Sequence, residues 1–448
     1  MKILIENTTI YKGDTFERQD DVNLLIEKGK IVDIASKLQV DDAQKIDGRN
    51  FFITPGFVNS HFHPSQQLNR ALGVGLSHDA QMDLLHATDQ IKDTQDAYWL
   101  SYIAALEGLK AGTTCFYSVG SNIDTQFEVY KTLGVRAACT LIPKDITHNE
   151  KTSDVRARIW ETKERLKKAE ELHKSFHSEL VRVHFGVVNV RYASDQLILG
   201  MLELAHKYNV FFQMHAAESN EYVENVLKRT GHRPVEHMFK IGALNERVSL
   251  AHAVHLNQHE IEYLADSGAH VIHCPRSNSY VGVGVCPVKD LINSNVNVAL
   301  GSDAAINNNS NEVRGEAHAA YDKMADKYQD AGVLGYLTLF RMLTINGARA
   351  MGIEKSIGTI EIGKRADLVL WSKDDLPFIP GFNHIADLIF TDSCRAHTVF
   401  IDGQKVLHNY KSTKVDEYEL IKRSRAISDK YYSAFQRLRL KAHVSLID

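Results

Sequence analysis

The chain has 448 residues, and its 52 basic and 56 acidic side chains give a formal net charge of −4, which leaves no basic surplus to neutralise nucleic-acid phosphates. The content of 44% hydrophobic and 24% charged residues is typical of a folded globular protein, and no apolar run reaches the roughly 18 residues that a membrane helix needs. Five scattered cysteines and an N-terminus unlike a signal peptide predict a reduced, cytoplasmic protein.

The first and last segments of the chain alternate apolar and polar residues, as half-buried strands do. Strands are predicted at 2–5, 22–26, 31–34, 399–401 and 405–407. The last two flank Asp402-Gly403, a dipeptide typical of a two-residue hairpin. We therefore predict that residues 1–54 and 355–448 form one composite β-sandwich domain around an inserted middle. The stretch 417–441 is predicted to be a docked terminal helix.

Between residues 55 and 354, short apolar runs alternate with longer helical patterns. Eight strands are predicted, at 51–53 leading into 58, 113–119, 135–142, 181–188, 210–216, 248–254, 270–273 and 296–300. Helices are predicted at 97–110, 155–173, 195–208, 221–230, 258–266 and 313–325. Such alternation indicates an α/β fold with a parallel sheet. Eight units over about 300 residues favour a (β/α)8 TIM barrel, with an open doubly wound sheet as the alternative.

Residues of metal-ligand type stand where four of these strands end, namely His61 and His63, His215, His252 and Asp303. Because the functional groups of a barrel lie at the carboxyl ends of its strands, we expect these side chains to converge at one mouth. A set of three histidines and one carboxylate, drawn from these residues, suits zinc or iron(II) and leaves one coordination position open for water. Glu218, three residues after His215, would then lie beside the ion, where a proton shuttle is needed.

Together these motifs resemble the amidohydrolase superfamily, in its branch of aromatic aminohydrolases, which includes guanine deaminase, adenosylhomocysteine deaminase and the triazine hydrolases. The matching segments span nearly the whole chain and are 55–63, 215–218, 251–256, 273–278, 301–303, 346–350 and 358–368. The resemblance implies one divalent metal ion, zinc or else iron(II), held by His61, His63, His215 and Asp303. It also implies that His252 touches the metal-bound water, that Glu218 protonates a ring nitrogen, and that Asp303 helps to deprotonate the water.

The number of metal ions also follows from the resemblance. Relatives with two metals bridge their ions with a carboxylated lysine on the fourth strand, and residues 181–188 contain no lysine. One metal is therefore predicted. The implied reaction is hydrolytic deamination of an oxo-substituted aromatic N-heterocycle, such as guanine, a pterin or an oxopyrimidine, in which metal-bound hydroxide attacks a ring carbon and ammonia leaves.

Two residues bear on the substrate, Gln66 and Arg191. Both match positions at which guanine deaminase-like enzymes hold the oxo edge of the ring, and an amide or a guanidinium can donate to a ring carbonyl. The alternatives are that Gln66 is only a loop residue and that Arg191 pairs with a local carboxylate such as Asp195. Adenosylhomocysteine deaminases typically have a histidine at the Arg191 position, so this departure counts against that substrate.

Other functions fit the same motifs. A triazine-type chlorohydrolase or alkylaminohydrolase would use the same site, but Glu218 favours loss of an amine, which needs a proton. An adenosylhomocysteine or methylthioadenosine-type deaminase is a further alternative. A catalytically silent barrel is another, although such a barrel would be expected to lack a metal-ligand residue or Glu218, and the sequence contains them all.

The only expected partners are a small heterocyclic substrate and further copies of the chain in a homodimer or larger oligomer. The resemblance implies that residues 72–93 cover the pocket. The run 307–311 follows Asp303 and so either overhangs the same mouth or forms a polar turn that caps the next helix, and the turn is favoured.

Overall fold

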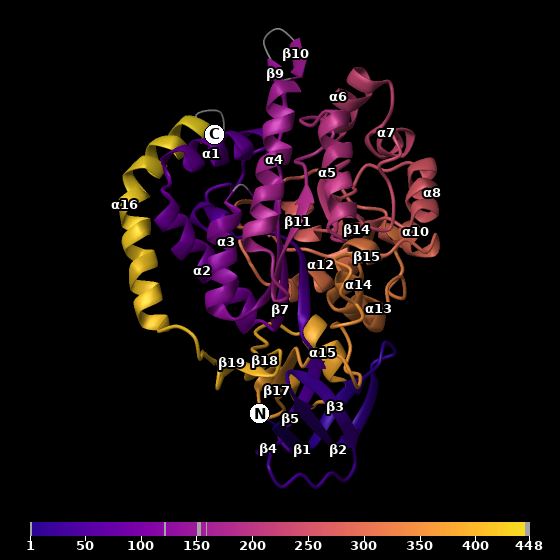
Figure 1. The fold of residues 1–448 in the computed structure, drawn as a ribbon, viewed down its shortest axis with the longest axis vertical. Coiled ribbons are helices and arrows are strands. Elements are labelled where there is room, and N and C mark those ends of the chain that lie inside the picture. Colours follow the sequence, from indigo (N-terminus) through magenta and orange to yellow (C-terminus); the bar gives the residue numbers. More distant parts are fainter. Residues whose placement is uncertain (1, 121, 150–153, 158, 444–448) are drawn as a thin grey trace.

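The computed structural model describes residues 2–120, 122–149, 154–157 and 159–443, and strands lie at its centre among helices (Figure 1). Within the described residues the central strands run parallel. The strands, in the order in which they pair, are β6 (Phe57–His63), β7 (Thr113–Gly120), β8 (Arg136–Leu141), β11 (Val181–Gly186), β12 (Phe212–Ala216), β13 (Val248–His252), β14 (His270–His273) and β15 (Val298–Leu300). The short strand β16 (Asp303–Ala304), separated from β15 by two residues, pairs in parallel with β6. This pairing closes the ring and confirms the predicted barrel over the open sheet.

Helices surround the barrel and cover its ends. They are α1 (His78–Ile91), α2 (Thr94–Lys110), α3 (Ile123–Leu133), α4 (Ile159–Phe176), α5 (Asp195–Lys207), α6 (Asn220–Thr230), α7 (Pro234–Lys240), α8 (Gln258–Ser267), α9 (Pro275–Tyr280), α10 (Val288–Asn293), α11 (Ala305–Asn308), α12 (Arg314–Tyr328), α13 (Tyr336–Leu343), α14 (Ile345–Arg349), α15 (His384–Phe390) and α16 (Glu417–His443), with 3-10 turns η1 (Pro64–Asn69) and η2 (Leu376–Phe378). Side chains from strands and helices, such as Phe116, Tyr130 and Phe185, share one buried core. Burial of both faces of the sheet explains the continuous apolar strand runs.

Two predicted elements differ from the structure. The helix predicted from residue 155 begins at Ile159, because β10 (Asp154–Ala157) pairs antiparallel with β9 (Ile146–Asn149). The strand predicted from 51 to 58 is two strands, β5 (Phe51–Pro55) and β6, which belong to different sheets. The chain changes sheet at Gly56, where a larger side chain would overlap Thr114.

The two ends of the chain build one composite β domain, as predicted. It comprises β1 (Lys2–Lys12), β2 (Glu17–Glu27), β3 (Lys30–Ala35), β4 (Gln44–Asp47), β5, β17 (Leu368–Ser372), β18 (Thr398–Ile401), β19 (Gln404–His408) and β20 (Lys411–Ser412), hydrogen-bonded in one sheet around a shared apolar cluster. The turn between β18 and β19 has positive φ at Asp402 (48°) and Gly403 (67°), as its sequence predicts for a tight hairpin. The domain boundaries at 54/55 and 354/355 stay predictions.

The C-terminal helix α16 lies against the outer side of α1 and α2 (yellow in Figure 1). Lys430 Nζ lies 2.7 Å from carboxylate oxygens of both Asp93 and Asp96, and the Tyr431 hydroxyl donates to Asp96 at 2.6 Å. These contacts confirm the docked terminal helix. Within the described residues, no helix combines the length and apolarity needed to cross a membrane.

Candidate functional site

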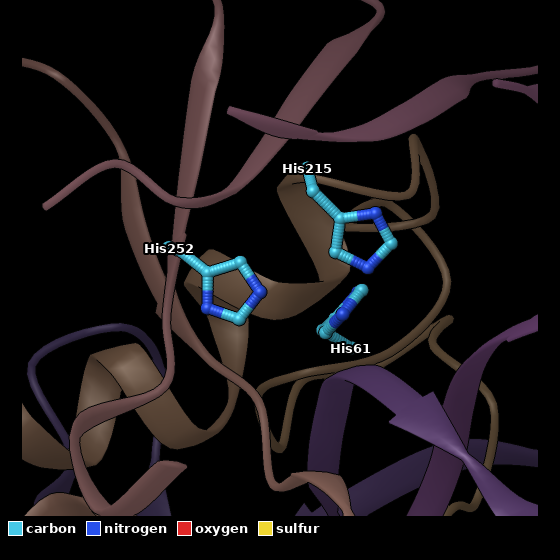
Figure 2. Close-up of side chains that lie close together, drawn as sticks. All are labelled: His61, His215 and His252. Carbon is cyan, nitrogen blue, oxygen red and sulfur yellow. The ribbon is translucent and has the colours of Figure 1, made fainter. Parts of the chain in front are cut away.

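The residues predicted at the strand ends meet at one end of the barrel. His63 Nε2 lies 3.2 Å from His61 Nε2 and 3.5 Å from His215 Nε2. Asp303 Oδ1 lies 3.6 Å from His61 Nε2 and 3.4 Å from His63 Nε2. Figure 2 shows the rings of His61, His215 and His252 turned toward a common space. Two sets of ligand atoms, one in His61, His215 and His252 and one in His61, His63 and Asp303, each lie within 4.8 Å of one another.

The outer ring nitrogens of these histidines are held by oxygen acceptors. His61 Nδ1 contacts Gln213 Oε1 at 2.8 Å, His215 Nδ1 contacts the Val188 carbonyl at 2.7 Å, and His252 Nδ1 contacts Asn278 Oδ1 at 3.0 Å. Because these oxygens only accept, each Nδ1 carries the proton and each Nε2 presents its lone pair to the centre. That arrangement is the one a metal ion requires.

Burial and neighbouring charges favour the protonation states that bind metal. Burial holds the pKa of His61 well below its usual value and lowers that of His63 to about 4, so both rings are neutral at pH 7. For Asp303, burial alone would raise the pKa, but His252, His61 and His63 outweigh it and the net shift is downward. Neutral imidazoles beside an ionised carboxylate form a donor set that fits a divalent metal such as zinc.

The backbone is strained where two of these side chains are presented. His252 has φ +74° and Asp303 has φ +59°, left-handed values that non-glycine residues seldom adopt. Such conformations cost about 1–3 kcal/mol each and persist where surrounding structure enforces them, often at functional sites. Both residues lie at the barrel mouth, His252 at the end of β13 and Asp303 at the start of β16.

Several supporting residues had no role assigned from sequence. Ser277 Oγ donates to Asp303 Oδ2 at 2.6 Å and Asn307 Nδ2 lies 3.2 Å from the same oxygen. The run 307–311 therefore reaches the barrel mouth through Asn307, which was the less favoured of its two interpretations from sequence. Gln213 had a usable signal, since it lies two residues before His215 and so shares its face of an otherwise apolar strand. Ser277 and Asn278 lie within the matched segment 273–278, but their contacts with Asp303 and His252 could not be predicted from the sequence.

A cavity of about 1530 Å³ opens over the histidines and is lined by Glu218, Gln66 and Arg191 among others. Glu218 is close enough to His215 for its charge to raise the pKa of that ring, although burial lowers it overall. Residues of α1, including His86, also line the cavity. This agrees with the expectation that residues 72–93 cover the pocket.

The two predicted substrate residues differ in their surroundings. Gln66 Oε1 is buried and has no hydrogen-bond partner among the described residues. Arg191 Nη1 lies 3.5 Å from Glu221 and its guanidinium lies 5.3 Å from the Tyr192 ring centroid. The suggested partner Asp195 instead accepts a hydrogen bond from His237 at 2.8 Å. Arg191 thus has a local carboxylate, but a different one from that suggested by sequence.

Comparison with known proteins agrees with the geometry. The chain is 31% identical to the 5-methylthioadenosine/S-adenosylhomocysteine deaminase of Thermodesulfovibrio yellowstonii, over 91% of this chain and 94% of the relative. It is 29% identical to the 5'-deoxyadenosine deaminase of Methanobrevibacter smithii, over 94% and 96% of the two chains.

Solved structures share the fold over almost the full length. A zinc-bound adenosine deaminase from Xanthomonas campestris superposes with a TM-score of 0.88 at 25% identity, over 96% of this chain and 98% of that one. The zinc complex of atrazine chlorohydrolase from Arthrobacter aurescens also gives 0.88, at 23% identity over 95% and 100%. The amidohydrolase family profile matches residues 52–406. The chain therefore belongs to the amidohydrolase family.

Proposed function

We propose that this protein is a zinc-dependent hydrolytic deaminase that removes an exocyclic amine from an aromatic N-heterocycle. The observation that carries the proposal is the set of Nε2 atoms and one carboxylate facing a common point, with their outer nitrogens held by acceptors. We assign one ion to His61, His63, His215 and Asp303. The zinc named in two structures of similar fold supports the choice of metal.

The chain's own residues supply the proton transfers of this reaction. Bound zinc would lower the pKa of a water toward 7 and so make a nucleophile available at neutral pH. Asp303, whose carboxylate is ionised, accepts a proton as the water attacks the ring carbon that carries the amine. Glu218 donates a proton to the adjacent ring nitrogen, and a proton passes to the amine so that it leaves as ammonia. His252 lies beside the reacting atoms and holds the attacking oxygen.

Two observations favour an adenosine-type nucleoside as the substrate. The relatives described above are named as deaminases of methylthioadenosine, adenosylhomocysteine and deoxyadenosine. The cavity of about 1530 Å³ also exceeds the roughly 300–1,000 Å³ of ordinary small-molecule sites, so it has room for a ring with a large substituent. This proposal replaces the oxo-substituted ring as the first candidate.

An oxo-substituted ring such as guanine is the second candidate, and Gln66 favours it. Its buried Oε1 has no partner among the described residues and can accept a ring N–H, while its amide nitrogen can donate to a neighbouring carbonyl. Arg191 lines the same cavity and can donate to that carbonyl.

Ammonia release by the zinc-loaded protein separates these candidates. The panel contains methylthioadenosine, 5'-deoxyadenosine, adenosylhomocysteine, guanine, isocytosine, a pterin, and amino- and chloro-triazines, with Glu218→Gln as the matched inactive control. Ammonia from the nucleosides alone supports the first candidate, and ammonia from guanine or pterin alone supports the second. Chloride release without ammonia, or no turnover of any compound by metal-loaded protein, would overturn the deaminase proposal.

A further inference from the structure

A second cavity, of about 820 Å³, lies at the end of the barrel opposite to the histidines. Its wall comes from residues at the amino ends of four neighbouring strands and from the chain around α14. Arg182 is the second residue of β11, Phe211 and Arg247 immediately precede β12 and β13, and His270 is the first residue of β14. The residues proposed for deamination all lie at the carboxyl ends of strands, so this cavity is separate from that site.

The charged lining of the second cavity is mainly basic. It contains four permanent cations and two carboxylates, namely Arg182, Arg247, Arg349, Lys355, Glu246 and Glu354. Among the described residues, no carboxylate oxygen lies within 4.0 Å of any of these four cations. Four positive and two negative groups leave a net charge of +2, which matches a dianion.

Arg182 combines partial burial with the lack of a compensating partner. It is half-buried, and no hydrogen bond or ion pair of its guanidinium is found in the described part of the chain. Burial lowers its pKa, and the nearby guanidinium of Arg136 lowers it further. Arg136 itself is neutralised by Asp367 at 2.7 Å and by Asp402 at 2.6 Å. A partly desolvated guanidinium without an anion is costly, so the position is suited to a bound one.

Arg247 is held at the cavity wall by an aromatic ring. Its guanidinium carbon lies 6.0 Å from the Phe211 ring centroid, a cation–π contact that leaves its N–H donors available. The Phe211 ring is stacked on His270, with centroids 6.3 Å apart and planes at 19°. Gly352 packs on the other part of this ring, where any side chain would overlap it. The ring therefore sets the orientation of Arg247 before a ligand arrives.

His270 forms part of the cavity wall but does not offer a ring nitrogen to a bound anion. Its Nε2 donates to the Glu246 carbonyl at 3.0 Å, and its Nδ1 lies 3.1 Å from Asn297 Nδ2, which donates to it. Both ring nitrogens are thus used within the protein, and burial lowers the pKa of this histidine to about 4. The donors left for a ligand are those of the arginines and Lys355.

We propose that this second cavity binds a tetrahedral oxyanion of the phosphate type, held by the guanidinium groups of Arg182 and Arg247, with Arg349 and Lys355 at its rim. A guanidinium presents several N–H donors in a planar fork that matches two oxygens of phosphate. The shared chemistry covers both free phosphate and the phosphate group of a small metabolite.

Calorimetric titration of the full-length, zinc-loaded protein with inorganic phosphate and with sulfate, at constant ionic strength, tests the proposal. We expect saturable binding of one anion per chain, weakened at least tenfold in Arg182→Gln and in Arg247→Gln. Arg425→Gln is the matched control, because Arg425 is exposed on α16 and its loss changes the net charge equally. A parallel titration with glycerol 2-phosphate distinguishes free phosphate from the phosphate group of a metabolite. Tighter binding of this ester than of inorganic phosphate would identify a phosphorylated metabolite as the ligand.

Two outcomes would overturn this inference. One is the absence of saturable binding to the wild type. The other is equal affinity in the wild type and in both cavity variants, which would place the anion elsewhere, for example at the zinc. Because Arg182 lacks a carboxylate partner, we expect Arg182→Gln without anion to melt no lower than wild type, so misfolding does not obscure the result.

Discussion

Replacing Gln213 by methionine is expected to weaken zinc binding although Gln213 is not itself a proposed ligand. Its Oε1 accepts from His61 Nδ1 at 2.8 Å and its Nε2 donates to the Ser60 carbonyl at 2.9 Å. Methionine keeps the length and volume of the side chain but makes neither hydrogen bond. The His61 ring then loses the contact that fixes its orientation and the position of its proton.

The size of the effect follows from these two contacts. Loss of an outer partner of a metal-bound histidine typically lowers metal affinity 10–100-fold, which is about 1.4–2.8 kcal/mol at 1.4 kcal/mol per tenfold. Two buried groups, the Nδ1–H of His61 and the carbonyl of Ser60, also lose their partner, at about 1–3 kcal/mol each. We therefore expect the metal-free variant to lose about 2–6 kcal/mol of unfolding free energy.

Competition with a chelator of known zinc affinity measures the first effect, and denaturant unfolding of the metal-free protein measures the second. Gln81→Met is the matched control, because Gln81 is also buried and donates to two backbone carbonyls, both at 3.1 Å, but contacts no proposed ligand. It should lose stability without losing zinc affinity. Gln213→Glu keeps an acceptor for His61 and should keep most of the affinity. Unchanged zinc binding in folded Gln213→Met would refute the positioning role.

The other predictions concern the site and its surroundings. His215→Ala should lose both zinc and turnover, and metal analysis showing a fully loaded, active variant would remove it from the ligand set. Glu218→Gln should keep zinc but lose about 10²–10⁴-fold in kcat; wild-type rates would exclude it as the proton donor. Arg191→Ala should mainly raise KM if the substrate carries an oxo group, and steady-state kinetics on guanine-type and adenosine-type compounds checks this. Burial raises the pKa of Glu316 from 4.5 to about 7, so the folded state holds this proton more tightly than the unfolded chain. The wild type should therefore lose up to about 3 kcal/mol relative to Glu316→Gln as pH rises from about 4.5 to about 7, and an equal difference at pH 5 and pH 8 by urea unfolding would contradict it.

The local pattern of apolar and polar residues was sufficient to predict most strands and helices of the barrel and the metal-ligand residues at the strand ends. Apolar runs of strand length that alternate with helical periodicity predicted the barrel strands from β7 to β15, because strands buried on both faces tolerate few polar residues, whereas the pattern merged β5 with β6 and missed the short β16. The same burial makes His61, His215 and Asp303 conspicuous, since each interrupts or ends such a run. Local pattern misassigned residues 155–157, where antiparallel pairing with β9 decides the structure.

Tertiary structure alone decided which side chains meet and how they are held. The closure of the ring between β16 and β6 brings Asp303 to His63 from 240 positions along the chain, and no local signal encodes that contact. Of the partners that orient each ring, only Gln213 had a signal in its spacing, whereas the Val188 carbonyl and Asn278 come from loops whose distance along the chain from His215 and His252 does not identify them. The basic cavity at the opposite end is likewise invisible in sequence, because Arg182 and Arg247 line one cavity only when β11 and β13 take their places in the barrel. Sequence determined the chemistry available to this protein, through residue types at strand ends, whereas packing of distant strands determined where that chemistry converges.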